Sequence, residues 1–378
     1  MSFDEYGCEE GKRPMIKRHI RNVLKGYSIH FVLILLCTLA TAHAGQWLHP
    51  KDIIKDPALA RLQQGRKELS PQEKEEIKKY GYTGLEIITY ADANYYPGKD
   101  WDAIFNSVSL GSDGHIRAQK WIQRTKWCYG TYQDLLTYNG IKPGDIRTKR
   151  ISIHFYPPEW IGNANLSYTY LEKEGMFKDE ASWIYLDKLR KIRHFAAGPK
   201  QDHVANMNIT YDDYRRRNPW EESHKVLGLD SFNGQECFVI ESKHRLIPNY
   251  YLSKRVIWIE KGKFLPLHEE QFNREDKLFF MIDKEWQQVK PWSYWVTSQW
   301  NIINLSIKSR SLYQSFDWIF DQGLKDEEFT LNQLRRPKYW RDIKIALPEY
   351  KKAEDFPPAP QIKWDFWERI GIKPAVVK

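Results

Sequence analysis

The sequence has few cysteines and lacks the short motifs that mark the common catalytic sites. Only 4 of the 378 residues are cysteine, and no Cys-x-x-Cys pair occurs, which excludes a thioredoxin-like redox motif and a zinc ribbon. Gly-x-Ser-x-Gly, Gly-x-x-x-x-Gly-Lys-[Ser/Thr] and Gly-x-Gly-x-x-Gly sequences are also absent. The simplest serine hydrolases, P-loop proteins and dinucleotide-binding proteins are therefore not supported.

Histidine and carboxylate spacing does not predict a metal or catalytic site. The closest approach to a zinc-protease helix, His268-Glu269-Glu270-Gln271-Phe272, has phenylalanine at the second ligand position. Neighbouring residues on a strand point to opposite faces, so we interpret three adjacent carboxylate pairs as surface charges: Asp212-Asp213, Glu221-Glu222 and Glu269-Glu270. We predict no enzyme activity, no catalytic residue, no metal and no cofactor. A hydrolase with carboxylates from separate strands is the least supported alternative.

The N-terminus carries a short apolar run. Phe31–Ala40 spans about ten residues, whereas a membrane-spanning helix needs roughly 20. Small residues follow it in Ala42-His43-Ala44, and basic residues precede it at Lys17, Arg18, Arg21 and Lys25. This order is typical of a secretory signal peptide, so we predict that residues 1–44 are removed after Ala44. A retained anchor is the alternative, and Met15 is an alternative start.

Export changes what the charge and the cysteines indicate. The net charge of +9 and the pI of about 9.1 would suit nucleic acid, but an exported protein meets no genomic DNA. The basic charge therefore favours membrane surfaces or acidic envelope partners. Cys128 and Cys237 remain after cleavage. They either pair as a disulfide or stay as two buried thiols, and both alternatives are open.

The chain favours strands over helices after Gly84. Its 16 Trp, 22 Tyr and 17 Phe suit broad sheets. Residues 45–84 are predicted to be helical, with a capping box at Ser70-Pro71-Gln72-Glu73. A β domain over 85–346 is expected to begin with a strand at 85–90 and to end with a short helix at Asp326–Leu334. A Pro-rich tail, 347–378, completes the chain, with Trp364 and Trp367 expected to attach it to the body. Frequent turns between short strands predict one antiparallel sheet partly closed on itself.

Two basic segments are candidates for docking or anion binding. In Leu189-Arg190-Lys191-Ile192-Arg193 cations alternate with apolar residues, which predicts a strand with one basic face. That face is either a docking edge, with Arg190, Lys191 and Arg193 as the contacts, or simply the exterior. Arg215-Arg216-Arg217 is a candidate for phosphate or lipid headgroups, but we favour a solvated turn before Pro219.

An ordered set of loose motifs between Trp183 and Leu334 resembles the outer-membrane lipoprotein-sorting-like proteins, a mostly uncharacterised group related to the LolA and LolB carriers. The motifs are Trp183-Ile184-Tyr185, Leu189–Arg193, Asn208–Asp213, His224–Gly228, Gly234–Ser242, Val256–Glu260, Glu269–Phe272 and Gly323–Thr330. Residues 45–150 and the tail match the group poorly.

The resemblance implies a mainly β (α+β) fold, namely a curved, incomplete antiparallel β-barrel around an apolar cavity with a few covering helices. It also implies a periplasmic carrier or chaperone for lipid or lipoprotein acyl chains, with an RND-type inner-membrane transporter as partner and without nucleic acid. The candidate cavity lining is aromatic and apolar, with ordinary core packing as the alternative for each residue: Trp183, Tyr185, Val256, Trp258, Trp295 and Val296. The alternative function is a non-carrier envelope module that docks to a membrane transporter.

Overall fold

The structure, a computed structural model, describes residues 49–95, 98–171, 180–196, 201–203, 208–215, 217–247, 249–341, 350 and 352–377. The chain divides into two compact units, one formed by Met1–Gln46 with Lys290–Ser293 and the other by Trp47–Val289 with Tyr294–Lys378. The fold below is that of the second unit. The predicted signal peptide lies outside the described residues. Among the described helices, none has the length and apolarity required for a membrane span.

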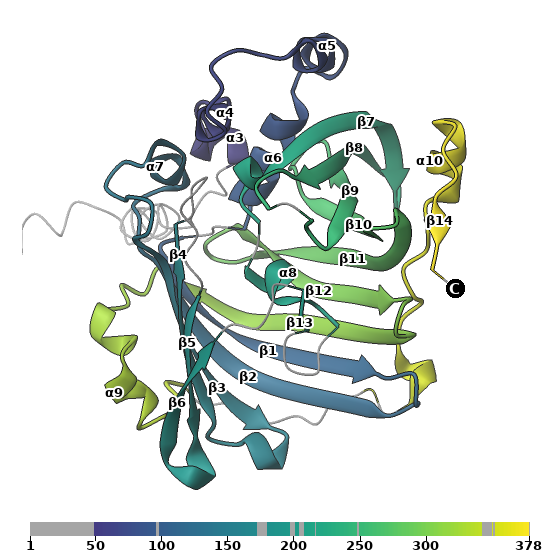
Figure 1. Cartoon of the computed structure of the whole chain (residues 1–378). Coiled ribbons are helices and arrows are strands. Elements are labelled where there is room, and N and C mark those ends of the chain that lie inside the picture. The colour runs from purple at the N-terminus through teal and green to yellow at the C-terminus, as the bar shows by residue number, and fades with distance from the viewer. Residues whose placement is uncertain are drawn as a thin grey trace, which may run out of the picture. The chain divides into compact units, whose positions relative to one another are not determined.

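The second unit is built on a 14-stranded sheet (Figure 1). Thirteen strands follow the order β6-β5-β4-β3-β2-β1-β13-β12-β11-β10-β9-β8-β7, with antiparallel neighbours, and β14 pairs in parallel with β11. The chain therefore runs as one meander from β1 to β6 and as a second from β7 to β13, and β1 joins β13 in the middle. Within the described strands, β6 and β7 each have one neighbour, so the barrel is incomplete. The predicted antiparallel sheet is confirmed.

The strands of the first meander are β1 (Asp100–Leu110), β2 (Ile116–Trp127), β3 (Ile146–Tyr156), β4 (Ala164–Tyr170), β5 (Ala181–Leu186) and β6 (Lys191–Ala196). Those of the second are β7 (Glu222–Phe232), β8 (Gln235–His244), β9 (Leu252–Glu260), β10 (Pro266–Asn273), β11 (Lys277–Val289), β12 (Tyr294–Asn304), β13 (Ser309–Phe320) and β14 (Ala375–Val376). Asn233-Gly234 forms the tight turn between β7 and β8, with φ of 48° and 76° at its two residues. Those positive angles are what a two-residue hairpin turn requires.

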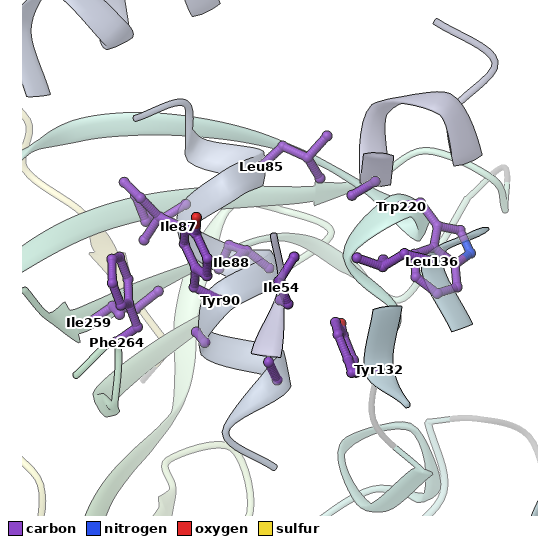
Figure 2. Packing of buried hydrophobic residues seen from close by; sticks show 14 of the residues in the cluster. Ile54, Leu85, Ile87, Ile88, Tyr90, Tyr132, Leu136, Trp220, Ile259 and Phe264 are labelled. Carbon is purple, nitrogen blue, oxygen red and sulfur yellow. The ribbon is translucent and has the colours of Figure 1, made fainter. Parts of the chain in front are cut away.

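Helices pack on the inner face of the strands from β7 to β10. They are α3 (Pro50–Ile53), α4 (Leu59–Gln63), α5 (Pro71–Tyr80), α6 (Gly84–Ala93) and α7 (Tyr132–Thr137). Together with Phe238, Ile240 and Ile257 of the sheet they form one apolar cluster, part of which is shown in Figure 2. The α6 side chains Leu85, Ile87 and Ile88 belong to this cluster. This part of the inner face is an ordinary hydrophobic core.

The predicted strand at 85–90 is wrong, because these residues belong to helix α6. The Thr83 hydroxyl caps this helix by accepting a hydrogen bond from the Glu86 backbone N–H. The Glu86 carboxylate in turn accepts a hydrogen bond from the Thr83 backbone N–H. Nearly every residue of α6 is buried. A helix that is apolar on all sides lacks the usual amphipathic period, and its β-branched residues then imitate a buried strand.

The buried Glu76 carboxylate holds α5, α6 and β7 together. It accepts hydrogen bonds from the backbone N–H of Gly84 at 2.9 Å and of Val226 at 2.9 Å. A Cβ at Gly84 would lie 3.1 Å from the backbone carbonyl carbon of His224, so glycine allows the close approach of α6 to β7. The capping box predicted at Ser70 is confirmed at the start of α5.

The outer face of the sheet is covered by C-terminal segments. Helix α9 (Leu331–Leu334) and Phe329 pack over β2 to β5, and helix α10 (Trp364–Arg369) packs over β8 to β11. The buried Trp367 indole donates to the Glu270 carboxylate at 2.7 Å, which confirms its expected role in attaching the tail. Trp364 does not share this role and remains 45% exposed. The short helix predicted at Asp326–Leu334 is confirmed as a 3-10 turn (Asp326–Glu328) followed by α9.

Candidate functional site: cavities on the inner face

Several cavities lie between the described residues along the inner face. One of about 590 Å³ lies beside α6 and α7, and two smaller ones adjoin each other over the rest of the sheet. The first of these two, which we call the aromatic cavity, has a volume of about 110 Å³ and is lined chiefly by rings from β1, β11, β12 and β13. The second, the hydroxyl cavity, has a volume of about 320 Å³ and lies over β2 to β5. Arg150 and Tyr214 line both cavities. The two cavities therefore adjoin at these two side chains.

The aromatic cavity is walled by rings that contact one another. Trp300 lies 5.4 Å from Tyr313 and Phe105 lies 5.5 Å from Tyr313, measured between ring centroids. Trp101 and Trp318 are 4.8 Å apart in the same way. Tilted and edge-on ring pairs at these distances stabilise one another, so the wall is rigid. It offers a ligand an apolar surface with few hydrogen-bonding groups.

Arg150 and Tyr214 mark the boundary between the two cavities. The guanidinium carbon of Arg150 lies 4.7 Å above the centre of the Tyr214 ring, and the Tyr214 hydroxyl donates to Gln123 Oε1 at 2.9 Å. Burial lowers the pKa of Arg150, but Tyr214 and Glu180 outweigh burial and raise that pKa above its ordinary value. Burial raises the pKa of Tyr214. At neutral pH the cation and the neutral phenol therefore lie face to face.

A charged cluster lies next to the aromatic cavity, and its members are Asp212, Asp213, Arg217, Glu222, Arg255, Glu269 and Lys284. Arg217 pairs with Asp212 at 2.9 Å and with Asp213 at 3.0 Å. Arg255 lies between Glu222 at 2.6 Å and Glu269 at 3.4 Å. Burial alone would raise the pKa of Glu269, but Arg255 and Lys284 lower it to about 2. Against the same effect of burial, Arg255 also lowers the pKa of Glu222, so Glu222 and Glu269 are ionised at neutral pH.

This cluster corrects two expectations. The three adjacent carboxylate pairs are not surface charges, since all six side chains are buried. Arg217 is not part of a solvated turn, because it is 8% exposed and bonded to both aspartates. Adjacent glutamates on β10 do point to opposite faces, as predicted: Glu269 joins the inner cluster and Glu270 faces α10. Arg217 and Arg255 pair with buried carboxylates. Without such partners, carboxylates are expected at the surface.

The six predicted lining residues fall in three places. Trp295 and Val296 on β12 line the aromatic cavity. Val256 and Trp258 on β9 are fully buried in the outer-face cluster beneath α10. Trp183 and Tyr185 on β5 lie in the outer-face cluster beneath α9. Val256 and Trp258, like Trp183 and Tyr185, share one face of their strand, but alternation does not tell which of the two apolar faces is concave. Trp295 and Val296 are neighbours that both reach the cavity, which simple alternation would not predict.

The basic segment at 189–193 is a hairpin turn followed by an edge strand. Leu189 ends a 3-10 turn (Asp187–Leu189), and Arg190 has a left-handed conformation with φ of 50°. The expected continuous strand is therefore wrong at these two residues. Lys191 and Arg193 lie on β6 and are exposed. They share one side of this edge strand, and Arg193 is opposite Ile184 of β5.

Cys128 and Cys237 are free thiols, which decides between the two alternatives. Cys237 lies on the outer face in β8, and burial raises its pKa to about 12. Burial also raises the pKa of Cys128. Both thiols are therefore protonated at neutral pH and behave as packing groups.

Most residues that line the cavities were missed from the sequence. Phe105 and Tyr313 lie on β1 and β13, two strands that were not predicted, although Asp100–Leu110 alternates in a strand-like way. Ser152, Ser167 and Ser182 carried no motif at all. The signal that unites them is cross-strand register, which is not visible until the strands are paired.

The fold and its concave site define a class of protein, the curved, incomplete β-barrels of the LolA type. A domain described as a putative outer membrane lipoprotein-sorting protein from Vibrio parahaemolyticus is 21% identical, with a TM-score of 0.55, covering 67% of this chain and 98% of that chain. A DUF1329 family protein from Desulfovibrio piger is 16% identical, with a TM-score of 0.56, covering 66% and 97%. The resemblance predicted from the motifs is confirmed as a shared fold.

The family of the chain is shown by a family model. The model described as "Uncharacterized protein" matches residues 148–336, which is half of the chain, and the chain belongs to this family. A LolA superfamily protein from Nitrosomonas europaea aligns at 13% identity with a TM-score of 0.44, covering 66% of this chain and 97% of that chain. A search among curated proteins found no match.

Proposed function

We propose that this protein is a periplasmic carrier that binds the acyl chain of a lipid or lipoprotein in the aromatic cavity. The observation that supports the proposal is a wall of contacting rings on the concave face of the sheet, beside a helix-covered hydrophobic core. Ligand sites are typically concave and largely apolar, with a few polar groups. Each methylene group that leaves water contributes about 0.8 kcal/mol, so a dry ring-lined cavity competes with a membrane for an acyl chain.

The charged cluster supports a carrier over a hydrolase. A glycosidase-type general acid needs a carboxyl group whose pKa is raised toward neutrality. Here Glu269 has its pKa lowered to about 2, and Asp213 is bonded to Arg217 at 3.0 Å and to Gln271 at 3.0 Å. Both carboxylates hold ion pairs on the inner face, and Glu269 has no proton to donate at neutral pH.

A cavity-filling variant tests the proposal. Thr297 lines the aromatic cavity, and Thr297→Trp places a ring in the space assigned to the acyl chain. We expect Thr297→Trp to weaken binding of a dansyl-labelled fatty acid at least tenfold while the melting temperature stays within a few degrees. The matched control is Thr137→Trp, at an exposed position of α7, which should bind like the parent. Equal binding by both variants would contradict the proposal.

A docking module is the second candidate, and the exposed edge strand β6 favours it. Lys191 and Arg193 give this edge a positive charge, which suits an acidic surface on an RND-type transporter in the inner membrane. Reversal of Arg190 and Arg193 to glutamate should abolish capture of that transporter from envelope extracts. Capture that survives the reversal would remove this candidate and leave the carrier proposal unaffected.

A further inference from the structure

Three serines line the hydroxyl cavity in register across three neighbouring strands. Ser167 on β4 lies opposite Arg150 on β3 and opposite Ser182 on β5. Ser152 on β3 lies opposite Asn165 on β4. All three serines are buried, with exposed fractions of 7% for Ser152, 3% for Ser167 and 8% for Ser182. Small polar residues at these positions keep the space above the sheet open where larger side chains would fill it.

Several polar groups of this cavity have no protein partner among the described residues. Within the described residues, the side-chain hydroxyls of Ser152, Ser167 and Ser182 form no hydrogen bond. The Nδ1 atom of His154 and the Nε atom of Arg150 are buried and also have no hydrogen-bond partner. Buried polar groups in native proteins are nearly always hydrogen-bonded. Two buried nitrogens without partners, together with three serine hydroxyls that open into the same cavity, therefore indicate a site that a polar ligand or water completes.

Aromatic rings enclose the same space. His154 lies 5.1 Å from Trp160 and 5.9 Å from Trp121, measured between ring centroids. Burial lowers the pKa of His154 to about 4, so its imidazole is neutral at physiological pH. Flat indole faces beside hydroxyl and imidazole groups fit a molecule that has C–H faces and hydroxyl edges.

The charges of the lining argue against an ionic ligand. Arg150 and Glu180 are the charged members of the lining, and they have opposite signs. Glu180 raises the pKa of Arg150 by its negative charge, so the cation is already balanced. A phosphate or sulfate group would need an excess of positive charge to repay its desolvation, and this cavity does not supply one.

We propose that the hydroxyl cavity binds the uncharged, hydroxyl-rich headgroup of a glycolipid, while the acyl chain of the same molecule enters the aromatic cavity. This inference rests on the proposed carrier function, since the two cavities meet at Arg150 and Tyr214. The serines and His154 bind the sugar hydroxyls, and Trp160 and Trp121 pack against the ring.

Three single-chain amphiphiles below their micelle concentrations test the inference: octyl β-D-glucoside, octylphosphocholine and octanoate. Calorimetry on the purified mature protein should show the glucoside binding at least tenfold tighter than the other two. Each lost hydrogen bond contributes about 1 kcal/mol. The triple variant Ser152→Ala, Ser167→Ala, Ser182→Ala should therefore weaken glucoside binding by about 10- to 100-fold. Its affinity for octanoate should not change.

Controls separate this inference from the carrier proposal. Ser223→Ala, at an exposed site on β7, should leave all three affinities unchanged. If the triple variant unfolds, Ser182→Leu, which fills the cavity, must show the same selective loss. Equal binding of the three amphiphiles, or an equal loss for all three, overturns the headgroup site and leaves the carrier intact. No binding of any amphiphile overturns both proposals.

Discussion

The two ends of the inner face use the same strand alternation for opposite purposes. Over β7 to β9 many inward residues are aliphatic or phenylalanine, such as Val226, Ile240 and Ile257, and the helices cover them in one apolar cluster. Over β2 to β5 the inward residues include Ser152, Ser167 and Ser182, and a cavity of about 320 Å³ remains. A sheet face becomes a core where a helix covers it, and a site where short polar side chains keep the space open.

The charged cluster lies between these two regions, and breaking it should have the largest effect. Arg255→Met leaves Glu222 and Glu269 buried without their shared cation. We expect a loss of about 3–5 kcal/mol in the free energy of unfolding, measured with urea. Arg369→Met, whose side chain is 53% exposed beside Asp230, should lose less than about 1 kcal/mol. Similar losses in both variants would show that the cluster is not a stabilising centre.

Truncating a buried aliphatic side chain should lower the free energy of unfolding more in the helix-covered core than beside the aromatic cavity. Ile87 is fully buried in the helix-covered core, so Ile87→Ala should lose about 2–5 kcal/mol. Val296 faces the aromatic cavity, so Val296→Ala only enlarges an existing space and should lose under about 2 kcal/mol. Fatty-acid binding should change in Val296→Ala and not in Ile87→Ala. Urea unfolding and ligand titration of both variants check this, and the reverse pattern would contradict the distinction.

Acid should destabilise both regions through buried neutral histidines. Burial lowers the pKa of His224, under the helices, and of His154, in the cavity, to about 4 from the ordinary 6.5. The unfolded chain binds these protons more readily than the folded protein. The contribution of the two neutral histidines to the free energy of unfolding is therefore fully present above pH 6.5 and falls as the pH drops toward 4. Each histidine contributes up to about 3 kcal/mol to this loss. Urea midpoints at pH 7 and 5 check the slope.

His224→Gln should flatten that slope. The His224 ring contacts Ser242 Oγ at 2.8 Å and the Pro219 carbonyl oxygen at 2.8 Å, and glutamine offers similar polar groups without a titration in this range. An unchanged pH dependence in His224→Gln would show that other groups control the acid response.

The smallest expected effect concerns the outer face, where His268 behaves in the opposite way. Burial lowers its pKa, but Asp283 and Glu270 outweigh burial and raise it above 6.5. Its stabilising contribution is therefore complete below pH 6.5 and is lost as the pH rises through the raised pKa. Glu270→Gln should cost about 1–2 kcal/mol and weaken this alkaline loss. Thermal unfolding of both proteins at pH 6 and 9 measures the difference, and identical pH profiles would refute it.

The sequence predicted the sheet better than the site. Hairpin turns such as Asn233-Gly234 and strands such as β9 depend on local chemistry, and they were found. Helix α6 was missed because tertiary burial removed its amphipathic period, although the Thr83–Glu86 capping box was present. The face of Val256 and Trp258 was left open, because alternation cannot distinguish a face beneath α10 from a concave one. The cavities and the charged cluster are both formed by residues that come together only when strands distant in the sequence pair, so neither could be predicted from local sequence.

Native mass spectrometry of the mature protein, released gently from the envelope of a Gram-negative host, tests the central claim most directly. The account predicts an added mass that corresponds to one amphiphile with a glycosyl headgroup, and that mass should disappear in Thr297→Trp. Protein that is repeatedly recovered without any ligand, or a bound mass that persists when the aromatic cavity is filled, would contradict it.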